Sequence, residues 1–228
     1  MSCAICEEGK EKRFCPAVHG KICPQCCGEQ RERTLDCPSE CPYLLQARQQ
    51  ARESAREHNE QPDQRDRETL LLDIEISEEF AYERKELILG LGFALAKSVR
   101  ADRSLMDRDL IAALGSLAKK YQTLVNSSLI YEPPTANLAH QAIAREVESM
   151  VREFREEEQR HIVELPGHMR LRDSDVLKAV IFLVRLGSVH TSGRPKSRAF
   201  VDMLFAMFPE KHSVIAGPEE AGSRIVIP

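Results

Sequence analysis

The sequence predicts a mainly α-helical protein in which a small cysteine-rich module precedes a helical arm and a bundle of about five helices. Three observations support this fold class. All eight cysteines lie within the first 41 residues, hydrophobic residues recur at helical spacing through most of the remaining chain, and patterns typical of strands are scarce. Hydrophobic residues make up 42% of the chain, which is enough for a packed core in the larger part.

The N-terminal module, residues 1–43, carries cysteines at the spacing of metal ligands. Thiolates at C-x2-C spacing converge on one tetrahedral zinc ion, and binding that ion supplies folding energy to a segment too small for a core. Eight ligands in four pairs predict two closed zinc sites, the pattern of structural rather than catalytic zinc. The predicted ligands are Cys3, Cys6, Cys15, His19, Cys23, Cys26, Cys37 and Cys41.

The order of these ligand pairs, C-x2-C, C-x3-H, C-x2-C and C-x3-C, resembles a B-box-type zinc finger, most closely from Phe14 to Cys26. The chain departs from that family in its last pair, where two cysteines replace the usual histidines. The resemblance implies a cross-brace of two zinc ions and a non-catalytic interaction or assembly module. The implied ligand sets are Cys3, Cys6, Cys23 and Cys26 for one ion and Cys15, His19, Cys37 and Cys41 for the other.

Cys27 lies outside the predicted ligand set. It is a spare small residue, a substitute ligand if His19 is not used, or a redox-reactive thiol whose oxidation ejects metal. A competing pattern, His19-x3-Cys23-x2-Cys26, resembles the single-zinc motif of bacterial zinc-binding anti-sigma factors. That motif leaves the other cysteines unexplained, and two zinc ions remain the prediction.

The rest of the chain divides by composition. Residues 44–58 are strong helix formers and predict a helical arm that leads out of the module. Residues 59–68 are wholly polar with a proline and predict a linker. The helical bundle is expected over residues 69–210, and an irregular tail over 211–228.

Five amphipathic segments are expected in the bundle, and the first is a single helix over residues 78–101. The others are placed by residues that cap or interrupt helices. Their expected starting points are a capping box at Ser104 and Asp107, a break at Pro133 and Pro134, a cap at Asp173 or Ser174, and Pro195 in a first turn.

Bulk composition narrows the function and the location. The net charge of −4 argues against a protein built around a nucleic-acid backbone. No segment reaches the length of a membrane helix, and no export signal precedes the cysteines. We therefore expect a cytoplasmic protein without membrane contact, whose clustered cysteines are metal ligands rather than disulfides.

The sequence favours a non-catalytic zinc-binding protein that acts as a protein-interaction or regulatory module, with another protein as its partner. No catalytic motif is recognisable in residues 69–228, and no catalytic residue is assigned. One alternative is a nucleic-acid-binding regulator that uses the zinc module and the basic segment, residues 194–198. A zinc–thiolate redox switch is the other. The charges of the basic segment also fit helix capping and solvation.

Overall fold

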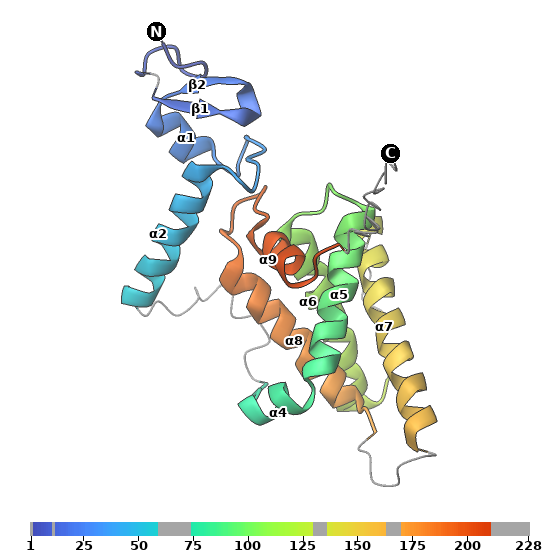
Figure 1. Cartoon of the computed structure of the whole chain (residues 1–228). Coiled ribbons are helices and arrows are strands. Elements are labelled where there is room, and N and C mark those ends of the chain that lie inside the picture. The colour runs from blue at the N-terminus through green and yellow to red at the C-terminus, as the bar shows by residue number, and fades with distance from the viewer. Residues whose placement is uncertain (1, 11, 59–73, 130–135, 163–169, 211–228) are drawn as a thin grey trace, which may run out of the picture.

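The computed structural model of the chain describes residues 2–10, 12–58, 74–129, 136–162 and 170–210. It is mainly α-helical, as predicted, with a small N-terminal module at one end, a long helix leading from that module, and a helical bundle (Figure 1). The predicted linker, 59–68, and the predicted tail, 211–228, lie outside the described residues. No helix among the described residues has the length and apolar character needed to span a membrane.

The module is built on two short antiparallel strands, β1 (Arg13–Cys15) and β2 (Gly20–Ile22), joined by a 3-10 turn. Helix α1 (Pro24–Gln30) follows β2 directly. Its first residue is proline, which suits the first turn because proline lacks a backbone N–H and an N–H at that position would have no helical partner. After a loop, helix α2 (Pro42–His58) corresponds to the predicted arm and begins two residues before it.

The bundle consists of the later helices. They are α4 (Glu78–Glu83), α5 (Lys85–Ala101), α6 (Asp107–Ser127), α7 (Leu138–Ile162), α8 (Asp173–His190) and α9 (Ala199–Met207). Helix α8 packs against α5, α6 and α9, while α7 covers the side formed by α5 and α6 (Figure 1). Helix α8 is therefore the central helix of the bundle.

Two hydrophobic cores are formed, one in each part. The bundle core contains fully buried side chains from every long helix, such as Leu95, Leu114 and Ile181. Each such side chain contributes on the order of 1.5–3 kcal/mol by leaving water. The module core is much smaller: it contains Ile22, Leu35 and several cysteines. A core of that size cannot support a fold without further cross-links.

The predicted single helix over 78–101 is wrong in one respect, because the chain turns at Arg84 between α4 and α5. Arg84 has φ −105° and ψ 21°, outside the helical range, and its backbone N–H still donates to the carbonyl of Phe80. Its guanidinium extends to Glu158 at 3.5 Å and to Asp175 at 2.9 Å. These partners, which are distant in the sequence, stabilise a helix break that local helix propensity does not predict.

The predicted capping box at Ser104 and Asp107 is also wrong. Helix α6 is preceded by Met106, whose N–H donates to the Asp109 carboxylate at 3.0 Å. Ser104 instead donates its N–H and its hydroxyl to Asp102. Helix α8 follows the same scheme two helices later. The predicted cap at Asp173 or Ser174 is therefore wrong: Arg172 precedes the helix, and its N–H donates to the Asp175 carboxylate at 3.2 Å.

Asp107 caps a different helix. It is fully buried and accepts hydrogen bonds from the Ser197 hydroxyl at 2.7 Å and from the N–H groups of Phe200 and Val201 at 3.1 Å. These N–H groups belong to the first turn of α9, where helical partners are missing. Helix α9 therefore starts at Ala199, and Pro195 lies in the preceding turn rather than in the first helical turn.

Candidate metal centre

Four of the predicted ligands converge at the end of the module. Cys3 and Cys6 come from the N-terminal loop, while Cys23 and Cys26 come from the start of α1, and all four sulfur atoms lie within 4.8 Å of one another. The Sγ atoms of Cys6 and Cys23 are 3.9 Å apart. With Zn–S bonds of ~2.3 Å, tetrahedral geometry places sulfur atoms about 3.8 Å apart. The four cysteines, here called the first cluster, therefore fit one zinc ion.

Backbone N–H groups point at these sulfur atoms. The N–H of Cys23 donates to Cys3 Sγ at 3.2 Å, that of Cys26 to Cys23 Sγ at 3.4 Å, and that of Gly9 to Cys6 Sγ at 3.4 Å. Cys23 is also the N-cap of α1, where the helix dipole favours negative charge. The surroundings of the cluster therefore stabilise thiolates, the form that binds zinc.

The thiols of the first cluster do not share one pKa. Hydrogen bonds from the N–H groups of Cys6, which has the largest effect, and of Cys23 and Ile5 lower the pKa of Cys3 to about 6 despite burial. The pKa of Cys26 is raised, first because its thiol is hydrogen-bonded to Cys23 and then by burial. Without metal, one sulfur is thus ready to ionise while another retains its proton. Zinc binding would release that proton.

Gly9 lets the N-terminal loop approach the ligands closely. A Cβ atom at this position would lie 2.7 Å from Cys23 Cβ, 2.9 Å from Cys23 Sγ and 3.4 Å from Cys6 Sγ. The first two distances are shorter than any normal contact. Glycine is therefore required here for steric reasons, a requirement that cysteine spacing alone does not reveal.

The remaining predicted ligands are placed differently. Cys15, Cys37 and Cys41 line one small cavity beneath the hairpin, whereas His19 is exposed and is not among the lining residues. Burial raises the pKa of Cys37, the N–H of Glu32 opposes that shift, and the nearby thiols of Cys15 and Cys41 raise it further. Within the described part of the chain, only the first cluster has its ligand atoms within 4.8 Å of one another. The second zinc ion stays a prediction.

All eight cysteines are free thiols. Cys27, whose role the sequence left open, is buried and lines the same cavity as Cys15, Cys37 and Cys41. The single-zinc pattern that uses His19 is not formed, because the first cluster takes Cys3 and Cys6 in its place.

The basic segment, residues 194–198, contacts the module. Arg194 donates to the carbonyls of Gly28 at 2.9 Å and Arg31 at 2.6 Å, so it neutralises acceptors at the C-terminal end of α1. Lys196 donates to the Thr34 carbonyl at 2.9 Å and pairs with Asp36. The third cation of the segment, Arg198, donates to two carbonyls in the turn before α6. These contacts make the segment a structural connection between the module and the bundle.

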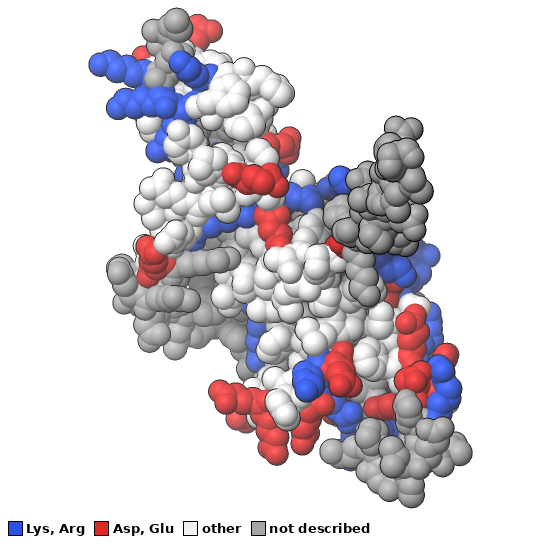
Figure 2. Space-filling model, viewed as in Figure 1, with Lys and Arg blue, Asp and Glu red and all other residues white. Residues whose placement is uncertain are grey.

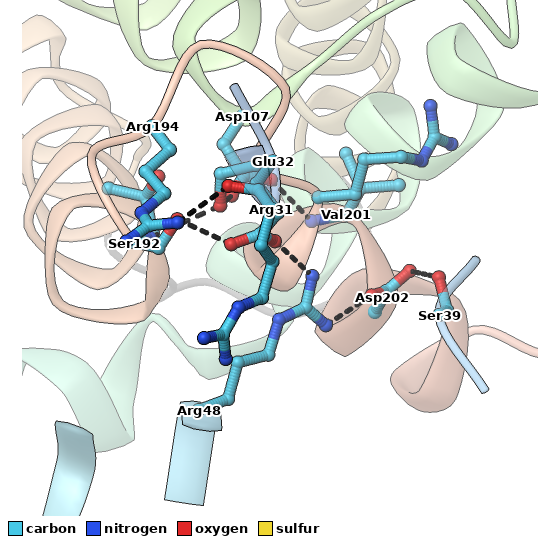
Figure 3. Close-up of polar contacts among 12 residues, drawn as sticks. Arg31, Glu32, Ser39, Arg48, Asp107, Ser192, Arg194, Val201 and Asp202 are labelled. Carbon is cyan, nitrogen blue, oxygen red and sulfur yellow. Dashed lines mark hydrogen bonds and ion pairs between the residues drawn. The ribbon is translucent and has the colours of Figure 1, made fainter. Parts of the chain in front are cut away.

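A buried carboxylate next to this segment completes the connection (Figure 3). Glu32 is only 3% exposed and accepts hydrogen bonds from Arg48 of α2 at 2.8 Å and from the Ser192 hydroxyl at 2.8 Å. The other arm of the Arg48 guanidinium pairs with Asp202 of α9 at 2.7 Å, and Asp202 also accepts from Ser39. The loop after α1, helix α2 and helix α9 are therefore joined by one network of charges.

This network was not predicted. Its partners are far apart in the sequence, and Glu32 looks there like an ordinary charge in a polar loop. In the structure Glu32 adopts φ 53°, a left-handed conformation that a non-glycine residue seldom takes without tertiary support. That conformation belongs to the structure rather than to the sequence.

No family model, curated protein or solved structure matches the chain. The resemblance to a B-box-type finger thus rests on the ligands themselves. The first and third cysteine pairs come together, as that resemblance implies, and form a cluster that can hold a metal ion.

Proposed function

We propose that the chain is a non-catalytic zinc-binding protein whose module binds another protein. The observation that carries the proposal is the first cluster. Its four cysteines would fill all four positions of a tetrahedral zinc ion, and such closed sites hold shape rather than activate water.

A candidate binding surface is the outer face of the hairpin, which we define as Lys10, Lys12, Phe14 and Lys21. Phe14 lies opposite Lys21 in the register of the two strands, so both side chains project from the same face. Phe14 is 59% exposed, and the three lysines are exposed. Large exposed aromatic residues are a common feature of binding surfaces.

The charge of this hairpin face points to an acidic partner. Figure 2 shows Lys and Arg side chains gathered at the end of the module that carries the hairpin. Opposite charges across an interface steer association and select partners. We therefore assign the hairpin face to a protein segment that combines carboxylates with an apolar side chain for Phe14.

Nucleic acid is the less favoured partner. The nucleic-acid alternative relies on the three cations of the basic segment. All three, Arg194, Lys196 and Arg198, have hydrogen-bond partners within the chain. The net charge of −4 also opposes general attraction to phosphate.

The test compares the wild-type chain with Phe14→Ala and with the double variant Lys12→Glu/Lys21→Glu. A captured partner is purified, and its Kd is measured by titration calorimetry; we expect at least about tenfold weaker binding for each variant. Leu138→Ala and Lys119→Glu, at exposed positions of the bundle, are matched controls that should leave the Kd unchanged.

Two results would count against the proposal. Binding that is unaffected by changes at the hairpin face would remove that face as the interface. Salt-dependent retention on DNA or RNA that the charge-reversal variant abolishes would instead identify nucleic acid as the partner. Zinc content is measured for each variant, so that lost binding is not confused with a lost metal.

A further inference from the structure

The strongest unexplained feature of the module is the small cavity beneath the hairpin. Its volume is about 10 Å³, close to the minimum that holds one water-sized guest. Four cysteines line it: Cys15, Cys27, Cys37 and Cys41. Cys15 and Cys27 are buried, and the other two are half-buried. These are all the cysteines that the first cluster does not use.

We propose that Cys15, Cys27, Cys37 and Cys41 form a second zinc site, in which Cys27 rather than His19 is the fourth ligand. Among the described residues that line the cavity, none is a histidine or an acidic residue. The four thiols are thus the available ligands there for a soft divalent metal ion, and zinc takes four such ligands in structural sites. No three of these four sulfur atoms lie within 4.8 Å of one another, so the proposal requires that the ion draw them together.

Adjacent positions of α1 can serve the two sites. Successive residues of an α-helix are rotated by about 100°, so the side chains of Cys26 and Cys27 leave the helix in different directions. Cys26 belongs to the first cluster, and Cys27 lines the cavity on the other side. One helix turn therefore contributes a ligand to each ion and ties the two sites together.

The other three ligands come from separate segments. Cys15 ends β1, Cys37 lies in the loop after α1, and Cys41 precedes α2. The carbonyl of Cys41 also accepts hydrogen bonds from the N–H groups of Leu44 and Leu45 at 3.0 Å, in the first turn of α2. A zinc ion here would therefore fix the start of α2 relative to the hairpin.

The charges around the cavity suit a thiolate site. A zinc ion with four thiolates carries a net charge of −2, which is costly in an apolar surrounding unless cations lie nearby. Arg13 and Arg31 both line the cavity. Arg13 stacks on Tyr43 with its guanidinium carbon 4.7 Å from the ring centre, and Arg31 donates to the Tyr43 carbonyl at 3.2 Å. Two arginines therefore line the same cavity as the four cysteines.

The test measures zinc per chain by elemental analysis on the full chain, purified without a metal-binding tag. We expect two zinc ions in the wild type, two in His19→Ala and one in Cys27→Ser. Two outcomes overturn the proposal. One is a loss of zinc in His19→Ala with none in Cys27→Ser, and the other is a wild type with one zinc ion that Cys27→Ser does not change.

X-ray absorption at the zinc edge of the wild type guards against misfolding of Cys27→Ser. The proposal predicts four sulfur atoms per zinc at ~2.3 Å and no imidazole scattering. An imidazole contribution would assign His19 as a ligand and overturn it. The proposed function is tested separately from the second site. A chain that holds one zinc ion and still binds its partner through the hairpin face would overturn the second site and leave the proposed function intact.

Discussion

At the scale of single residues, the metal centre depends on a glycine, Gly9, next to its ligands. Gly9 brings the N-terminal loop against Cys23, and a Cβ atom there would overlap the Cys23 side chain. Cys23 and Cys6 are both ligands of the first cluster, so any shift that relieves the overlap moves sulfur atoms away from tetrahedral geometry. The zinc affinity should therefore fall when Gly9 is replaced by a residue that has a Cβ atom.

Gly9→Ala is expected to weaken zinc binding by on the order of tenfold or more, the usual effect of changes next to metal ligands. Competition with a chromogenic chelator measures the affinity. Gly28→Ala is the matched control, because a Cβ atom at Gly28 has its nearest neighbour, an Arg31 nitrogen, at 3.9 Å. Equal affinities for the two variants would show that the close approach of the loop is unimportant.

At the scale of elements, periodicity was enough to predict the helices but not their ends. The buried faces of α5, α6, α7 and α8 follow hydrophobic spacing, which is a local property. The break at Arg84 and the cap that Asp107 gives to α9 depend instead on partners about 75 to 95 positions away in the sequence. Cap signals were therefore assigned to the wrong helix, since a sequence shows a capping residue but not the helix it caps.

The same reason explains what was predicted of the site. Each C-x2-C pair carries its binding geometry locally, but Cys3, Cys6, Cys23 and Cys26 were assigned to one ion only through the resemblance to a B-box-type finger. Longer and irregular spacing surrounds the other ligands, and there the structure exposes His19 and buries Cys27. The contact of the basic segment with α1 could not be anticipated, because nothing local distinguishes a cation that binds carbonyls from one that binds phosphate.

The attachment of the module to the bundle gives a prediction at this scale. Arg48→Met leaves the buried carboxylate of Glu32 with only the Ser192 hydroxyl and removes a partner of Asp202. Breaking a buried pair by removing one partner costs about 3–5 kcal/mol, and we expect the lower end because Asp202 is partly exposed. The free energy of unfolding in urea measures the loss.

Lys97→Met is the control for this experiment. It removes the Lys97–Glu146 pair, whose lysine side chain is 60% exposed, and exposed pairs contribute less than about 1 kcal/mol. Similar losses for the two variants would mean that the network around Glu32 contributes no more than an ordinary surface pair.

At the scale of the whole molecule, the chain has two cores of different origin. The bundle core is large and apolar, and it does not include the cysteines. The module core is built mainly from cysteines and a few apolar side chains, and we propose that bound metal supplies much of its stability. Polar contacts of the basic segment and of Glu32 connect the two cores without merging them (Figure 3).

Hydrogen-exchange mass spectrometry before and after zinc removal by a chelator tests the central claim, that zinc holds the module together, most directly. We predict that β1, β2 and α1 lose protection on chelation and regain it when Zn²⁺ is returned, while α5, α6 and α8 remain protected. A module whose protection does not change on chelation would contradict the account.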